Sequence, residues 1–130
     1  MTIQVVNLHK TTADWNLGRS SSLGNPFKVE GDNLDLVCDV FAEYLFHILL
    51  HKESIPADVA VDISLRYHLR ISTAYKNPSR EEILTLLAEV YGVAKTEDVT
   101  IGCYCKPKRC HLDTVKQFLD DRIHRSMVLS

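Results

Sequence analysis

Two kinds of hydrophobic pattern alternate along this chain, and the alternation limits the folds that it can adopt. Apolar residues recur every three or four positions in three segments, which are 33–52, 79–92 and 112–123. Short runs rich in β-branched or aromatic residues lie between them, at 3–8, 15–17 and 99–104. Helices that alternate with strands are typical of α/β proteins. We therefore expect one α/β domain over residues 1–130, three-layered, with a partly parallel central sheet flanked by helices.

The segment 59–71 has a different pattern. Its apolar residues occupy every second position from Val59 to Ile71, which places them on one face of a strand. Pro56 offers an alternative, because proline is favoured in the first turn of a helix. The alternation predicts a strand here, and the helix remains the second interpretation.

Composition and charge exclude several classes of protein. The chain is 45% apolar and 25% charged, with a formal net charge of −2, which is ordinary for a globular domain. A chain with a slightly negative net charge has no positive electrostatic field that would attract the phosphate backbone of a nucleic acid. We therefore expect no nucleic-acid partner. The N-terminus lacks the pattern of a secretory signal, and the longest nearly uncharged apolar run, 44–50, is too short to span a membrane. The sequence predicts a cytoplasmic protein with no membrane association.

Three of the four cysteines form a cluster with a histidine near the C-terminus. The cluster consists of Cys103, Cys105, Cys110 and His111. It lies between a predicted strand and a predicted helix, where open α/β sheets bind ligands. In a reducing compartment, clustered cysteines indicate a metal or a catalytic site more often than a disulfide. Three thiols and an imidazole would suit zinc, although the spacing differs from that of common zinc motifs. Simple packing of buried cysteines is the remaining alternative.

The same segment also suits a reactive thiol. Cys110 lies at the start of a helix with Arg109 beside it, and both features favour a thiolate, so Cys110 or Cys105 could be a catalytic group. Cys103 and Arg109 have the separation found in cysteine-dependent phosphatases. That reading is disfavoured because no glycine lies between them and Pro107 lacks an amide donor.

A loop rich in turn-forming residues, 18–27, is the second candidate for a site. It follows a predicted strand, so it could face the same sheet edge as the cysteine cluster. Its candidate ligand-binding residues are Arg19, Ser20, Gly24 and Asn25, and those of the cluster are Arg109 and His111. Arginine offers a planar fork for phosphate, and glycine allows a ligand to approach the backbone. Phe27, at the end of the loop, is expected in the core.

These two motifs together resemble those of domain-of-unknown-function family 4326, found in bacteriophages and bacteria. The resemblance rests on Gly18-Arg19 with Leu23-Gly24-Asn25-Pro26-Phe27, and on Cys103-x-Cys105-x-Pro107-x-x-Cys110-His111. It implies an α/β fold with a site at the two motifs, and the host cytoplasm as location if the chain is phage-encoded. Relative to compact members, 54–78 resembles an insertion, and Leu112 replaces a glycine. The tail, 126–130, is expected to fray.

Two functions follow as expectations. The first is a phage-type accessory protein that binds a phosphorylated small molecule, a nucleotide or a nucleotide sugar, with group transfer or hydrolysis as its reaction. The second is a non-enzymatic module that binds a host protein and uses the cysteine cluster as a structural zinc knot.

Overall fold

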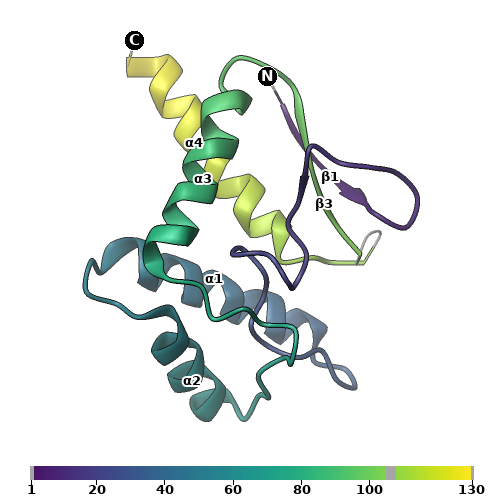
Figure 1. Ribbon diagram of the computed structural model, residues 1–130, viewed down its shortest axis with the longest axis vertical. Coiled ribbons are helices and arrows are strands. Elements are labelled where there is room, and N and C mark those ends of the chain that lie inside the picture. The colour runs from purple at the N-terminus through teal and green to yellow at the C-terminus, as the bar shows by residue number, and fades with distance from the viewer. Residues whose placement is uncertain (1, 105–107, 130) are drawn as a thin grey trace.

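The computed structural model describes residues 2–104 and 108–129, with side chains as far as residue 125. Within this part of the chain it has three strands and four helices (Figure 1). In chain order they are β1 (Ile3–Asn7), β2 (Trp15–Asn16), α1 (Leu34–Leu50), α2 (Pro56–Tyr67), α3 (Arg80–Ala94), β3 (Val99–Cys103) and α4 (Leu112–Leu129). The expected small α/β fold is confirmed.

The sheet is parallel throughout, and β3 is its central strand. The strand order is β1-β3-β2, with Asn7 opposite Cys103 and Asn16 opposite Gly102. Parallel strands end at the same edge of a sheet, so the chain leaves β1, β2 and β3 side by side. The loop after β2, which is 18–27, and the segment that leads into α4 both start from this edge.

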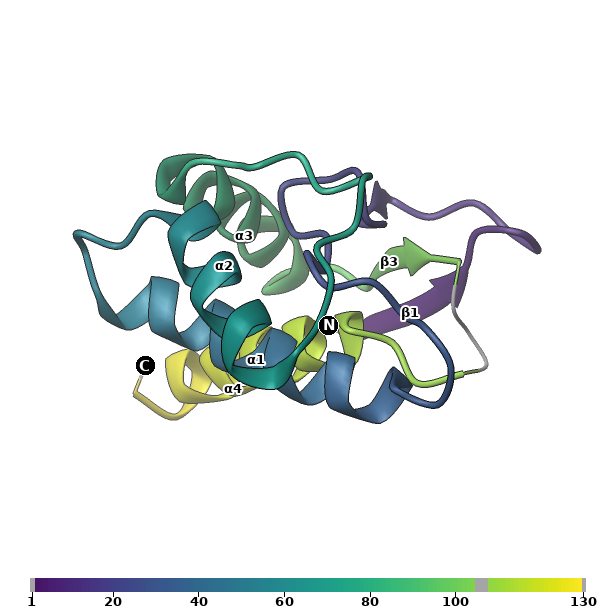
Figure 2. The ribbon, with the colours of Figure 1, turned by 90° about the horizontal axis from the view of Figure 1, so that it is seen from below.

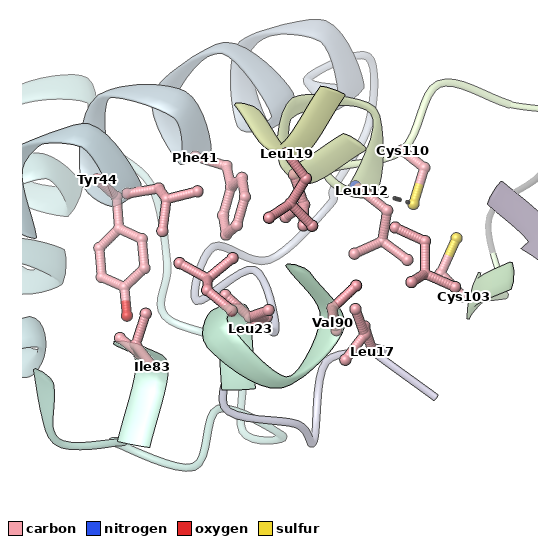
Figure 3. Packing of buried hydrophobic residues seen from close by; sticks show 14 of the residues in the cluster. Leu17, Leu23, Phe41, Tyr44, Ile83, Val90, Cys103, Cys110, Leu112 and Leu119 are labelled. Atoms are coloured by element: carbon pink, nitrogen blue, oxygen red, sulfur yellow. Dashed lines mark hydrogen bonds between the residues drawn. The ribbon is translucent and has the colours of Figure 1, made fainter. Parts of the chain in front are cut away.

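The helices enclose the core together with the sheet. Helix α4 packs on β1 and β3, and it also contacts α1 and α3. Figure 2 shows α1 and α4 together on one side of the molecule and α3 on the other. Buried side chains from all these elements meet between them, among them Phe41, Tyr44, Ile83, Val90 and Leu119 (Figure 3).

Helix α3 begins as the sequence predicts. The Ser79 hydroxyl accepts a hydrogen bond from the Glu82 amide at 3.1 Å, and the Glu82 carboxylate accepts one from the Ser79 amide at 3.2 Å. This capping box satisfies two backbone donors that would otherwise lack a partner. The helix continues to Ala94, two residues beyond the predicted end.

The predicted strand at 59–71 is wrong, because residues 56–67 form α2. Pro56 occupies the first turn, and the buried residues Ala60, Ile63 and Ser64 follow at helical spacing and lie on the side that meets α1. The alternating apolar pattern misleads because three of its seven members, Val61, Leu65 and Tyr67, are exposed; Leu65, for example, is 72% exposed. The helix ends at His68, whose φ of 55° is left-handed.

The C-terminal tail is helical as far as it is described. Helix α4 runs to Leu129, and fraying of the tail stays a prediction. The periodic pattern weakens after Ile123, but each further residue adds a backbone hydrogen bond to a helix that already exists. No described helix combines the length and the apolar character that crossing a membrane requires.

Candidate functional site

The loop at 18–27 is held together by its own arginine. The Arg19 guanidinium donates hydrogen bonds to the carbonyl oxygens of Asn25, at 3.0 Å, and Phe27. Two tight turns within the loop are closed by backbone hydrogen bonds from Ser21 to Gly18 and from Gly24 to Ser21. Arg19 therefore fixes the path of the loop, and a direct contact between Arg19 and a ligand stays a prediction.

Position 24 requires glycine because the surrounding backbone leaves no space for a Cβ atom. A Cβ atom there would lie 2.6 Å from the carbonyl carbon of Arg19 and closer still to its oxygen. The obstacle is backbone, which cannot move aside as a side chain can. Gly24 thus allows the two halves of the loop to touch.

Asn25 joins the loop to the first turn of α1. Its side chain is only 2% exposed, and its amide nitrogen donates to the carbonyl oxygen of Val37 at 3.2 Å. Its amide oxygen accepts from the backbone amide of Phe27 at 2.9 Å. Phe27 itself is fully buried against the edge of Tyr44, as the sequence predicts. Like Arg19, Asn25 has partners within the chain that define the shape of the loop.

His111 links the end of β2 to the start of α4. It is buried, and its ring packs edge-on against Phe41, with the centroids 4.9 Å apart. Its Nε2 lies 3.1 Å from the carbonyl oxygen of Leu17. A carbonyl can only accept, so Nε2 carries the proton in this geometry. The other nitrogen, Nδ1, faces the Cys110 sulfur at 3.7 Å.

Burial keeps His111 neutral. It lowers the pKa of His111 from 6.5 to about 4. A negative charge on Cys103 acts in the opposite direction, but desolvation of the imidazolium is the larger effect. Neutral imidazole with a fixed tautomer leaves Nδ1 with a lone pair, which is the form that binds metal ions or accepts a proton.

The sulfur of Cys110 lies at the amino end of α4. The backbone amide of Leu112 donates to it at 3.5 Å, a contact drawn in Figure 3. The Asp113 carboxylate accepts from the Cys110 amide at 3.2 Å, so side chains at both ends of this turn cap the helix. Cys103 and Cys110 are each 1% exposed, and Figure 3 shows both beside Leu112. The structure thus brings Cys103, Cys110 and His111 together, whereas Cys105 lies outside the described residues.

Arg109 forms a bridge to α1. Its guanidinium pairs with the carboxylates of Asp39, at 2.6 Å, and Asp35, at 3.2 Å. Hydrogen bonds to Asp39 and then Asp35 raise the pKa of Arg109. The cation that the sequence suggests for an anionic ligand is therefore shared with two carboxylates.

Exposed groups surround the carboxyl edge of the sheet. Ser20 and Lys108 are exposed, and the ring of Tyr104, 53% exposed, lies 4.6 Å from that of His9, centroid to centroid. The space above Gly18 is bordered by the same tyrosine ring. Sequence reasoning missed Tyr104, and for His9 it preferred a solvent-exposed strand end to a place at the site. Both rings follow the ends of strands, but only the structure shows that these two strands pair in parallel.

Metal binding by the cluster remains a prediction. Among residues 2–104 and 108–129, no group of three or more His, Cys, Asp or Glu side chains is arranged to hold a metal ion. The predicted set also needs Cys105, so the described residues test only part of it. The fourth cysteine, Cys38, is buried on α1 and belongs to the core side of that helix.

Fold and site together define a small parallel α/β domain with a Cys–His cluster at the carboxyl edge of its sheet. The model of one family, Domain of unknown function (DUF4326), matches residues 5–121. The chain belongs to this family, as the two motifs suggest. Comparisons with curated proteins and with solved structures found no match.

Proposed function

We propose that this protein binds a phosphorylated small molecule, a nucleotide or a nucleotide sugar, at the carboxyl edge of its sheet. The observation that supports this most is the convergence there of three parallel strand ends, the loop at 18–27 and the amino end of α4. Ligands of open α/β sheets bind at that edge, and phosphates bind where a helix begins.

Each part of the edge suits one part of such a ligand. The amino end of α4 and the exposed Lys108 offer positive charge to a phosphate. The exposed ring of Tyr104, which is tilted by 59° against that of His9, offers an aromatic face to a base, and the exposed Ser20 offers a hydroxyl. Arg19 and Asn25 maintain the shape of the loop. Arg109 could bind a phosphate only if its ion pair with one of the two aspartates of α1 were broken.

A reaction at this edge would use a cysteine. Group transfer or hydrolysis would require the thiolate of Cys110 or Cys105 as the attacking group. Cys110 is buried beside a neutral imidazole whose Nδ1 could accept the thiol proton. A ligand would have to reach the sulfur from the strand edge, so binding is the primary proposal and catalysis its extension.

Thermal stabilisation by ligands tests this proposal. Saturating ADP or UDP-glucose is expected to raise the melting temperature of the wild-type protein, since a ligand that binds only the folded state stabilises it. Lys108→Glu and Tyr104→Ala should each abolish the shift while leaving the melting temperature without ligand nearly unchanged, because both side chains are exposed.

Lys52→Glu, which changes another exposed lysine in the loop after α1, is the matched control and should retain the shift. If ADP and UDP-glucose raise the melting temperatures of Lys108→Glu and Lys52→Glu by the same amount, binding at the strand edge is contradicted.

A non-enzymatic module with a structural zinc ion is the second candidate. It is favoured by His111, which donates from Nε2 to a backbone carbonyl and points Nδ1 toward the Cys110 sulfur. Zinc-binding histidines commonly make this outer contact, because it fixes the ring and the tautomer. Cys103 and Cys105 would complete a tetrahedral set of three sulfurs and one nitrogen.

Metal content of protein purified without added metal tests the second candidate. About one zinc per chain is expected, with unfolding on chelation, because binding energy of a structural zinc contributes directly to folding. Cys110→Ser should lose the zinc, whereas Cys38→Ser, which changes the buried cysteine of α1 that is not among the proposed ligands, should retain it. Metal-free wild-type protein that melts at the same temperature with and without chelator would rule the zinc out.

A further inference from the structure

An apolar groove lies on the helical side of the molecule, away from the strand edge. It has a volume of about 520 Å³ and runs between α1, α3 and α4. Its floor is formed by Leu87 and Leu119, and its open sides by Phe46 and Leu50, which are 41% and 77% exposed. Contiguous apolar surface of this kind with a polar rim marks an interaction site.

The groove continues into a second hollow along α1 and α4. This hollow, about 470 Å³ in volume, shares Phe46, Leu50, Phe118 and Arg122 with the groove. The rings of Phe46 and Phe118 meet edge to face, with their centroids 6.2 Å apart, and lie between the two hollows. The result is an elongated surface, which suits an extended apolar ligand better than a compact one.

The rim of this surface is cationic. Arg122 lines both hollows, Arg125 lines the second, and Lys95 lies over the ring of Tyr91, which lines the first. Arg122 stacks on Phe118 and, within the described part of the chain, makes no ion pair with a carboxylate. Of the described residues that line the two hollows, Asp121 is the single acidic one. On a chain of net charge −2, this local excess of cations favours an acidic partner.

We propose that this surface, the α1/α3/α4 groove, binds an amphipathic helix of a partner protein that carries apolar residues on one face and carboxylates beside them. A helix laid in an apolar groove contacts it through residues at every third or fourth position, and flanking carboxylates would reach Arg122 and Arg125. The proposal is independent of the strand edge. Arg122 lies ten residues beyond Leu112, which places it about 15 Å along α4 from the site described above.

Two synthetic peptides test the proposal by fluorescence anisotropy. Both are 18-residue amphipathic helices with leucine on one face, one flanked by glutamate and the other by lysine. The glutamate peptide should bind the wild-type protein at least about tenfold more tightly than the lysine peptide. Phe46→Ser should weaken binding of the glutamate peptide about tenfold or more, as expected for an exposed aromatic anchor.

Charge reversal gives the sharper result. Arg122→Glu should invert the preference, so that the lysine peptide binds more tightly. Leu65→Ser is the matched control for Phe46→Ser, because it removes a leucine that is 72% exposed on α2 outside the groove. It should change the affinity of neither peptide. Thermal unfolding of each variant establishes that it is folded.

Three results would overturn the proposal. The first is equal binding of both peptides by wild-type protein and by Arg122→Glu. The second is a dimer in sedimentation that Phe46→Ser dissociates, which would make a second copy of the chain the occupant. The third is Phe46-dependent binding to phosphatidylcholine–phosphatidylglycerol vesicles without peptide binding, which would make a lipid surface the occupant.

Discussion

Replacing Gly24 by alanine is expected to destabilise the protein by about 3 kcal/mol, at the upper end of what overpacking costs. The new Cβ would lie inside the van der Waals radius of the Arg19 backbone, 2.8 Å from its Cα and 2.6 Å from its carbonyl carbon. The loop would have to open, and the two carbonyls that Arg19 holds would move away from its guanidinium. Thermal unfolding should show a melting temperature lower by roughly 10 °C.

Gly92→Ala is the matched control for that substitution. Gly92 lies in the last part of α3, and an added Cβ would meet nothing within 4 Å. Alanine is the better helix former, so this variant should be about 1 kcal/mol more stable than the wild-type protein. Should Gly24→Ala prove as stable as Gly92→Ala, the tight closure of the loop would be disproved.

Acidification is expected to destabilise the protein through His111. Burial lowers the pKa of the folded form to about 4, against 6.5 for a solvated histidine. Above pH 6.5 the imidazole is neutral in both states, so His111 adds no pH dependence there. Between pH 6.5 and about 4 the unfolded chain takes up a proton that the folded chain does not. The free energy of unfolding should therefore fall by up to about 1.4 kcal/mol for each pH unit in this window.

Denaturant unfolding of wild-type and His111→Gln proteins across this range isolates the contribution of His111. Glutamine can still donate to the Leu17 carbonyl but does not titrate, so the difference in stability between the two proteins should narrow as the pH falls. Carboxylates also titrate in this range, but they do so in both proteins. His124→Gln, which changes an exposed histidine of α4, is the control for the substitution itself and should leave the stability at neutral pH nearly unchanged. A constant difference between wild type and His111→Gln would show that His111 is not buried as a neutral ring.

The fold class could be predicted because local patterns agree with the tertiary structure in most elements. The capping box at Ser79, the β-branched run at 99–103 and the helical period of α1 each specify their element without help from elsewhere. Residues 56–67 are the exception. Their apolar residues alternate, and Pro56 was the local signal for a helix, but the packing of α2 on α1 decides between the two interpretations.

The candidate site was predicted residue by residue, and the structure adds the contacts that these residues make within the chain. Arg19 and Asn25 look like ligand contacts in the sequence because they are polar residues in a glycine-rich loop. In the structure their polar atoms bond to carbonyls and an amide of the chain itself. Tyr104 was overlooked and His9 was interpreted as a solvent-exposed strand end, because a single ring after a strand indicates no site until the partner strand is known.

The sequence by itself determined the alternation of strands and helices, the two motifs and the family, because these depend on spacing along the chain. Only the tertiary structure decided that β3 is central and parallel to both neighbours, which brings residues 18–27 beside the start of α4. It also decided that His111 is neutral, because the ionisation of an imidazole depends on what surrounds it. The groove between α1, α3 and α4 arises in the same way, from three segments whose apolar residues are distant in sequence.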